Sequence, residues 1–257
     1  SVKDELRRCI SEGFEGFELY FQPIYNTDDD SLSGAEALIR WNSRKYGFIG
    51  PNTFIPLLED SALIIPLGRW IINTAAKACN RWITSIPDFV MHINLSFVQI
   101  VKSNIVKDVL ENIERYSAAN NHYVFEITET IEMDQIPAVQ NVFKEFVKNE
   151  FRFAIDDFGT GYSNYGYMRD RTFDIVKVDR SFVTDIDKLK DNYLMVSFII
   201  KMAHEMGLHV CIEGVETKEE LSCVKKLGAD YIQGYYYGKP VCLQDFEEQH
   251  LKRFVLG

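Results

Sequence analysis

The sequence predicts an α/β fold that closes into an eight-stranded barrel whose first strand is antiparallel. Eight short runs rich in β-branched and aromatic residues are separated mostly by longer helical patterns. A crossover helix lets successive strands run parallel, so this alternation favours a closed barrel. Only the stretch YNTDDDSL joins the first two runs. A connection that short makes a hairpin, which turns the first strand against its neighbour.

The individual elements follow from periodicity and end signals. The expected strands are residues 17–24, 33–41, 89–96, 122–129, 151–157, 173–179, 208–214 and 229–234. Between the second and third strands, one helical face collects Ile71, Ala75, Ala78, Cys79 and Trp82. A later helix begins with a capping box, Thr217 and Glu220, and ends near Gly228. Both helices should therefore pack on the barrel.

Composition limits the partners and the compartment. Acidic residues outnumber basic ones 38 to 28, a formal charge of −10, so no basic face is expected for a DNA or RNA duplex. The five cysteines form no CxxC pair and suit free thiols in a reducing compartment, which indicates a cytoplasmic domain. No apolar run reaches the length of about 20 residues that a membrane helix needs.

The chain is expected to be a single domain, because 257 residues suit one barrel. Residues 1–15 are interpreted as a helical lead-in, since they lack the apolar core of a signal peptide. We expect the domain to come from a larger multidomain protein, which could carry an upstream sensor or a membrane anchor.

Polar residues recur near the carboxyl ends of the predicted strands, in otherwise apolar surroundings. They are Glu36, Asn94, Glu126, Asp156, Asp157, Lys177, Glu213 and Gln233. In a barrel these ends converge on one mouth, where active sites lie. Carboxylates gathered there would repel one another by roughly 4 kcal/mol per close pair at an intermediate dielectric. Cations are therefore expected among them.

The chemical nature of these side chains indicates which cations they would bind. All are oxygen ligands, without thiolate or imidazole, which favours hard ions such as Mg²⁺ or Mn²⁺. Two adjacent aspartates can serve two ions, with Asp156 bridging them and Asp157 holding the second. Such a pair activates a water for attack on phosphorus.

The chain resembles the EAL-domain cyclic di-GMP phosphodiesterases along nearly its whole length. The motifs that carry the resemblance occur in the family's order: YFQPIY, GAEALIRW, FIPLLEDS, INLS, FEITET, DDFGTGYSN, DIVKVDRSFV, IEGVET and QGYYYGKP. The resemblance implies a modified (β/α)8 TIM-type barrel with an antiparallel first strand. It also implies metal-dependent hydrolysis of one phosphodiester bond of cyclic di-GMP to linear pGpG, with two ions, Mg²⁺ or Mn²⁺.

The resemblance also implies a role for each site residue. The first metal would be held by Glu36, Asn94, Glu126 and Asp156, and the second by Asp156 and Asp157. Lys177 would contact the attacking water, and Glu213 would be a metal-site carboxylate or a general base. Arg40 would grip a substrate phosphate, with Leu38, Gln22 and Gln233 near the nucleotide. Glu129 would anchor the loop that follows the aspartate pair, residues 158–170, which we expect to act as a lid and a homodimer contact.

Other interpretations remain open at this stage. A non-catalytic cyclic di-GMP receptor would share the fold, and a GGDEF-type domain could accompany either form. A lysine at a strand end is also typical of Schiff-base aldolases, and acidic mouths are typical of enolase-like enzymes. Gln22 and Gln233 could equally satisfy loop backbone, and Asp179 is expected to be structural. The histidines, His92 among them, have no ligand spacing and are assigned to core or surface.

Overall fold

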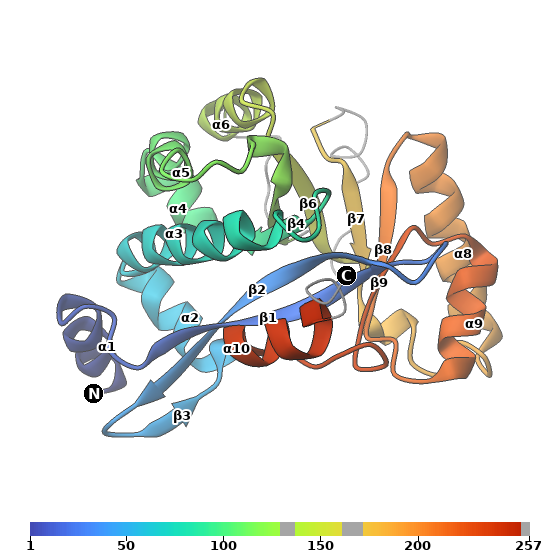
Figure 1. Ribbon diagram of the computed structural model, residues 1–257, viewed down its shortest axis with the longest axis horizontal. Coiled ribbons are helices and arrows are strands. Elements are labelled where there is room, and N and C mark those ends of the chain that lie inside the picture. The colour runs from blue at the N-terminus through green and yellow to red at the C-terminus, as the bar shows by residue number, and fades with distance from the viewer. Residues whose placement is uncertain (129–136, 161–171, 253–257) are drawn as a thin grey trace.

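The computed structural model describes residues 1–128, 137–160 and 172–252 of the chain. These residues form a closed barrel of eight strands surrounded by helices (Figure 1). The strands follow one another around the barrel in chain order, and β1 closes it by pairing with both β2 and β9. The barrel strands are β1 (Phe17–Asn26), β2 (Leu32–Ser43), β4 (Val90–Asn94), β5 (Tyr123–Thr128), β6 (Arg152–Phe158), β7 (Ile175–Val178), β8 (His209–Glu213) and β9 (Tyr231–Gln233).

The predicted strands and the predicted direction of the first one are confirmed. β1 runs antiparallel to β2 and to β9, with Gln22 opposite Glu36 and Ile24 opposite Gln233, whereas the pairs from β2–β4 through β8–β9 are parallel. Sequence analysis missed two short strands at the edges, β3 (Gly47–Ile49) and β10 (Val241–Cys242). Strands of three and two residues are too short to show an alternating pattern.

Helices connect the strands and cover the outside of the barrel. Figure 1 shows α3 to α6 on one side and α8 and α9 on the other. The helices are α1 (Val2–Ser11), α2 (Pro51–Asp60), α3 (Ile64–Trp82), α4 (Phe97–Lys102), α5 (Ile105–Ile113), α6 (Pro137–Lys148), α8 (Lys190–Glu205), α9 (Lys218–Leu227) and α10 (Leu243–Phe246). Short helical turns η1 (Asn120–His122), η3 (Arg180–Phe182) and η4 (Glu247–Leu251) complete the described elements.

The two helices analysed in the sequence form as expected. α3 buries Ala75, Ala78, Cys79 and Trp82, while Ile71 is only half-buried. In α9, the side chain of Thr217 accepts from the Glu220 backbone N–H, and the Glu220 carboxylate accepts from the Thr217 backbone N–H. The helix ends at Gly228 with φ +86°. Glycine suits that left-handed position because it has no Cβ to clash.

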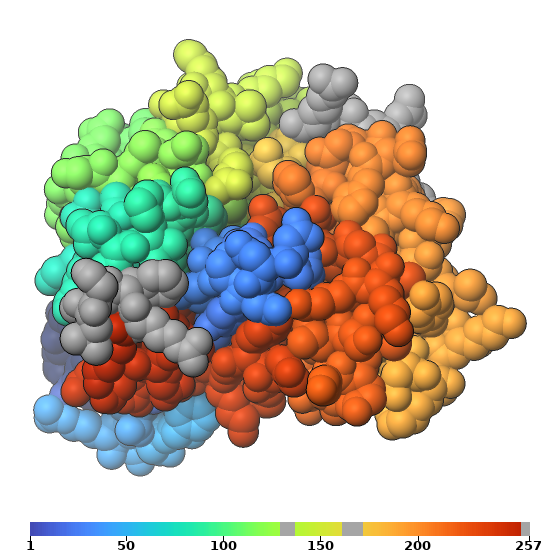
Figure 2. All heavy atoms as spheres, turned by 45° about the vertical axis from the view of Figure 1, so that its right-hand side comes forward, coloured from blue at the N-terminus to red at the C-terminus, as the bar shows by residue number. Residues whose placement is uncertain are grey.

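The barrel seam joins segments that are far apart in the chain. In Figure 2, the blue β1–β2 region lies against the orange and red carboxyl-terminal third. The Thr27 backbone N–H donates to the Asp230 carbonyl at 3.0 Å, and the Lys225 ammonium lies 2.7 Å from Asp30. Tyr25 stacks on Tyr237 with ring centroids 4.4 Å apart. Hydrogen bonds, charge and aromatic packing thus close the barrel together.

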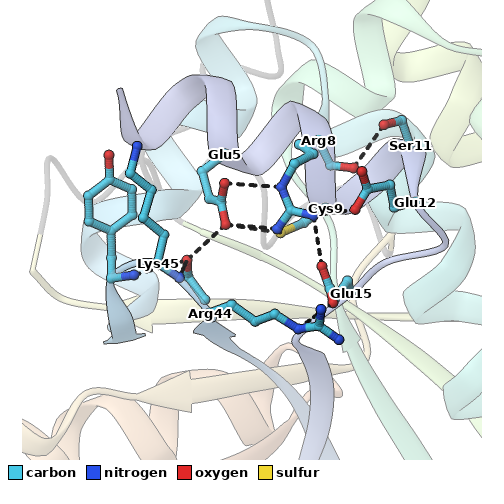
Figure 3. A network of polar contacts seen from close by, with 10 residues as sticks. Glu5, Arg8, Cys9, Ser11, Glu12, Glu15, Arg44 and Lys45 are labelled. Atoms are coloured by element: carbon cyan, nitrogen blue, oxygen red, sulfur yellow. Dashed lines mark hydrogen bonds and ion pairs between the residues drawn. The ribbon is translucent and has the colours of Figure 1, made fainter.

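Helix α1 packs beside the barrel through its own small core. Leu6 and Cys9 are buried in a cluster with Trp41 and Phe54. Figure 3 shows the charged side of this contact, where the Arg8 guanidinium pairs with carboxylates of Glu5, Glu12 and Glu15, and Glu15 also pairs with Arg44. Within the expected lead-in, residues Val2–Ser11 are therefore helical and attached to the β2–β3 hairpin.

The cysteines agree with the sequence expectation. All five are free, and Cys9, Cys79 and Cys211 are buried. None of the helices in the described ranges is long and apolar enough to cross a membrane.

The barrel interior is layered because successive side chains of a strand face opposite sides. One layer is apolar and consists of Ile24, Val124, Ala154, Ile175 and Cys211. Two residues further along β5, β6, β7 and β8 come Glu126, Asp156, Lys177 and Glu213. The same alternation that builds the apolar layer thus delivers charged side chains to the mouth.

Candidate active site

Lys177 lies at the centre of the mouth and is fully buried. Its ammonium nitrogen is 2.7 Å from Glu126, 2.8 Å from Glu213, 3.1 Å from Glu36 and 3.5 Å from Asp156. Burial alone would lower the pKa of Lys177, but the surrounding carboxylates outweigh it and hold that pKa well above its ordinary value. The lysine is therefore an ammonium ion.

This arrangement changes the expected balance of charge. Sequence reasoning assigned the relief of carboxylate repulsion to bound cations alone, whereas the chain carries an internal cation at the point where the carboxylates meet. A single ammonium cannot neutralise the five acidic groups at the mouth. The local excess of negative charge is what attracts a divalent ion.

Glu36 is held by three side chains. The Asn94 amide donates to its Oε1 at 2.7 Å, the Gln233 amide donates to its Oε2 at 2.6 Å, and Lys177 approaches the same oxygen. Burial raises the pKa of Glu36, but the charge of Lys177 and these hydrogen bonds prevail and lower it to about 2. Glu36 is therefore ionised at any physiological pH.

The two predicted glutamines belong to the same network. Gln233 Nε2 also lies 3.1 Å from Gln22 Oε1, and Gln22 Nε2 donates to the Gly238 carbonyl at 3.3 Å. Both glutamines are buried. The Gln22 amide thus bonds the backbone after β9, whereas the Gln233 amide bonds Gln22 and Glu36, and both side chains line a hollow of about 200 Å³ with Glu213 and Tyr235.

Glu126 has a different environment from Glu36. Its Oε2 accepts from Lys177 at 2.7 Å, and its Oε1 lies 2.7 Å from His92 Nδ1. Burial, together with the negative charge of Glu36, raises the pKa of Glu126 well above its ordinary value despite Lys177. Burial lowers the pKa of His92 to about 3, so the imidazole is neutral.

The adjacent aspartates both reach the mouth because β6 is irregular at its end. The pairing of β6 with β7 shifts register between Ile155 and Phe158, and Asp157 has a left-handed backbone with φ +53°. In a regular strand, neighbouring side chains would face opposite sides. Non-glycine residues with positive φ are uncommon and often occur at functional sites. The bulge therefore turns Asp157 back toward Asp156.

These carboxylates form two groups with spacing that suits metal ions. Oxygens of Glu36, Glu126 and Asp156 lie within 4.8 Å of one another, and so do oxygens of Asp156, Asp157 and Glu213. Asp156 belongs to both groups. Its buried Oδ1 has no hydrogen-bond donor among the described residues, although the Lys177 ammonium is 3.5 Å away. Two neighbouring metal ions would require a carboxylate that belongs to both groups and has an oxygen free of hydrogen bonds. Within the described part of the chain Asp156 meets both conditions, so the donor set fits divalent metal.

Glu213 ends β8 beside these groups. The next residue, Gly214, has φ +73°, and a Cβ at that position would lie 2.2 Å from the Cβ of Arg180. Glycine therefore allows the chain to leave the strand sharply and keeps Glu213 at the mouth. Burial raises the pKa of Glu213 to about 8, against the opposing charge of Lys177.

A cleft of about 990 Å³ opens beside the acidic groups. Its lining includes five of the predicted residues, Leu38, Arg40, Asn94, Asp156 and Asp157. The Arg40 guanidinium lies over the Tyr20 ring, 5.4 Å from its centroid. Apolar walls with a few convergent polar groups are typical of small-molecule sites.

Sequence analysis and structure differ at a few positions. His92 is buried, in agreement with its assignment to the core, but its contact with Glu126 was missed. Its place two residues before Asn94 on β4 was the signal for an inward-facing side chain. Asp179 is structural as expected, because its carboxylate accepts from the Ser181 N–H at the start of η3. Glu129 and most of the expected lid, residues 161–170, lie outside the described residues.

Fold and site together define a class of protein, an α/β barrel with an acidic, metal-compatible mouth beside a large cleft. The chain belongs to the EAL domain family, whose model matches residues 3–240. Membership rests on nearly the whole chain and thus covers every site residue described above.

Related proteins give this family membership a context. The probable cyclic di-GMP phosphodiesterase PdeG of Escherichia coli is 32% identical over 241 residues, which cover 93% of this chain and 47% of PdeG. The structure of the EAL enzyme Bd1971, in a form bound to cAMP and cyclic di-GMP, matches with a TM-score of 0.90 at 34% identity, over 96% of this chain and 67% of that one. The PaMucR phosphodiesterase in complex with c-di-GMP matches with a TM-score of 0.86 at 28% identity, over 94% and 99%.

The chain spans less than half the length of three curated relatives that it matches. It covers 37% of an uncharacterised Synechocystis protein and 28% of a Sinorhizobium fredii protein, as well as 47% of PdeG.

Proposed function

We propose that this chain hydrolyses one phosphodiester bond of cyclic di-GMP and releases linear pGpG. One observation carries the proposal. The two clusters of three carboxylates share Asp156, and Asp156 lines the same cleft as Arg40. Phosphodiester hydrolysis needs both a site for divalent charge and a cation that binds the phosphate. The names of the relatives supply the substrate, cyclic di-GMP.

Two ions, Mg²⁺ or Mn²⁺, suit the oxygen donors of the mouth. The first would be held by Glu36, Asn94, Glu126 and Asp156, and the second by Asp156, Asp157 and Glu213. When bound, such ions neutralise phosphate charge and activate water for attack on phosphorus. Asn94 lies close enough to contribute because its amide already contacts Glu36 at 2.7 Å.

The substrate contacts follow from the lining of the cleft. Arg40 can present two parallel N–H groups to a phosphate, which a lysine cannot do. Tyr20 supports the guanidinium from below through a cation–π contact. Leu38 contributes an apolar wall for the nucleotide, and Gln22 and Gln233, which line the smaller hollow with Tyr235, would contact the nucleotide from there.

Lys177 and Glu213 are proposed to handle the water and its proton. The Lys177 ammonium can orient a water by donating to its oxygen, and its high pKa argues against the aldolase interpretation, because a Schiff base needs a neutral amine. Before any ion binds, the pKa of Glu213 is about 8. Once its own carboxyl group is ionised, Glu213 can accept a proton from the water. Its position also permits service as a metal ligand.

A direct assay tests the proposal. Purified protein is incubated with cyclic di-GMP and Mg²⁺ or Mn²⁺, and product is separated by chromatography, with parallel samples containing chelator. We expect linear pGpG only with metal, and no product from Glu36→Ala. A folded protein that binds metal and cyclic di-GMP but leaves it intact would contradict hydrolysis and establish the receptor function instead.

We also propose that the chain acts as one cytoplasmic domain of a longer protein and forms homodimers. Its partial coverage of the relatives supports the first part, and the free cysteines support a reducing compartment. An exposed apolar face on α8, formed by Leu194, Met195 and Phe198, supports self-association. Sedimentation analysis of the wild type and of Phe198→Glu tests this, with a monomeric wild type contradicting it.

A further inference from the structure

His92 lies inside the barrel, one layer below the acidic mouth. It is buried, and its strand also carries Asn94 on the same side, two residues further on. Its neighbours in the sheet are Glu36 on β2 and Val124 on β5. An imidazole in this position costs stability unless its polar atoms form hydrogen bonds.

That contact is with one of the candidate metal ligands. His92 Nδ1 is 2.7 Å from Glu126 Oε1, and the Lys177 ammonium is 2.7 Å from the other oxygen, Oε2. A carboxylate that binds metal is ionised and can only accept hydrogen bonds, so the imidazole donates from Nδ1. Two donors from two different strands therefore fix both the plane and the rotation of the Glu126 carboxylate.

We propose that His92 is a positioning residue that orients Glu126 for metal binding. Each carboxylate oxygen has two acceptor positions, so a hydrogen bond from His92 leaves Oε1 able to bind an ion. Outer partners of this kind orient ligands, and their loss typically lowers metal affinity by 10- to 100-fold. The inference rests on the proposed metal-dependent function, and it assigns His92 a part in metal affinity that a core histidine would not have.

A matched pair of variants separates positioning from packing. Asparagine places an amide nitrogen at nearly the same distance from the backbone as Nδ1, whereas leucine has nearly the same shape as asparagine but no donor. His92→Asn should therefore preserve the hydrogen bond to Glu126, and His92→Leu should remove it. Ile175→Val, in the apolar layer of the barrel, serves as a control for core disturbance without a polar contact.

The experiment measures Mn²⁺ binding by calorimetry, together with thermal stability, for the wild type and the three variants. We expect His92→Leu to weaken Mn²⁺ binding by about 10- to 100-fold, His92→Asn to stay within about threefold of the wild type, and Ile175→Val to bind as the wild type does. Thermal midpoints show that each variant is folded. Equal Mn²⁺ affinity in His92→Leu and the wild type would overturn the inference.

Failure of the proposed function gives a different result. If the wild type binds Mn²⁺ but does not hydrolyse cyclic di-GMP, the hydrolytic function is wrong, while the difference between His92→Leu and His92→Asn still supports the positioning role. If hydrolysis proceeds and both variants bind Mn²⁺ normally, the function stands and the positioning role is wrong.

Discussion

Ionisable groups lie at both ends of the β8–β9 pair, and the groups at the two ends behave differently. At the mouth, Glu213 ends β8 and its pKa is raised to about 8. At the opposite end, Asp230 precedes β9 beside His209, the first residue of β8, and also contacts His204 at 2.8 Å. Burial would raise the pKa of Asp230, but hydrogen bonds from His209, His204 and the Val210 N–H lower it to about 2.

The difference shows that a carboxylate's surroundings decide whether it stabilises the fold. Asp230 is partly open to water and is satisfied by donors, so its ionisation stabilises the protein. Glu213 shares one ammonium with three other carboxylates, so its ionisation costs stability until another cation arrives. Such strained electrostatics are typical of functional sites, whereas satisfied ion pairs are typical of structural ones.

The largest effect is expected from Lys177→Met, which removes the internal cation and keeps the length of the side chain. An uncompensated buried charge typically costs about 3–5 kcal/mol, so the metal-free protein should lose stability on that scale. Hydrolysis should fall by at least about 100-fold, as for loss of a group that aids proton transfer. Denaturant unfolding and product formation measure both effects.

Lys188→Met is the matched control for this change, because Lys188 is exposed and pairs with Asp185 on the surface. It should leave activity and unfolding nearly unchanged. If the two lysine variants lose similar stability, the special electrostatics assigned to the mouth are wrong.

The next effect concerns Asp157. Burial and the charge of Asp156 raise the pKa of Asp157, so its ionisation is unfavourable without metal. Asp157→Asn should therefore raise the melting midpoint in chelator while hydrolysis falls by about 100-fold or more, since a ligand of the second ion is lost. Asp185→Asn is the control, because Asp185 also has positive φ, at 55°, but its exposed carboxylate pairs with Lys188 on the surface. A lower midpoint for Asp157→Asn would contradict this prediction.

Glu213 at the mouth and Asp230 at the opposite end of the barrel should make the free energy of unfolding depend on pH with opposite signs. In the metal-free protein Glu213 keeps its proton up to about pH 8, whereas the unfolded chain loses it near 4.5. The folded state binds more protons in this window, so the free energy of unfolding should fall by up to about 1.4 kcal/mol per pH unit as pH rises. Unfolding in chelator from pH 5 to 8 measures this slope, and Glu213→Gln should reduce it. Saturating Mg²⁺ should remove it, because metal binding favours the ionised form.

The smallest effect is expected at the opposite end. Asp230 contributes stability above pH 3.8, and that contribution is lost as pH falls toward 2. Asp230→Asn should cost about 1–2 kcal/mol at pH 7, below most of the usual range for hydrogen bonds to a charged group because solvent screens this partly exposed carboxylate, and should leave the rate of hydrolysis unchanged. Denaturant unfolding with a parallel assay checks both. A large loss of activity in a folded variant would show that the two ends are coupled.

The sequence alone was sufficient to predict the barrel and to name most of the polar side chains at its mouth. Strand alternation and one short connection predicted eight strands and the antiparallel β1, because these depend on local pattern. Sequence analysis placed Glu36, Glu126 and Asp156 near the carboxyl ends of their strands and predicted that they would meet, because parallel strands place these ends at one rim. The three carboxylates do meet, although Glu36 lies in the middle of β2 rather than near its end.

What sequence could not give depends on contacts between strands. The pairing of Lys177 with four carboxylates requires the interior arrangement of the closed barrel. The bulge that turns Asp157 inward is a matter of register between β6 and β7, which no single-strand pattern encodes. The bond from His92 to Glu126 likewise joins two residues that are 34 positions apart and lie on different strands.

The closure of the barrel has a consequence for synthesis of the chain. β1 pairs with β2 early, but its other edge must wait for β9 and β10, which are made about 200 residues later. During translation that edge would expose unpaired backbone groups, a template for unwanted association. The nascent domain should therefore need protection until its final strands leave the ribosome, and the acidic rim can be completed only after that moment.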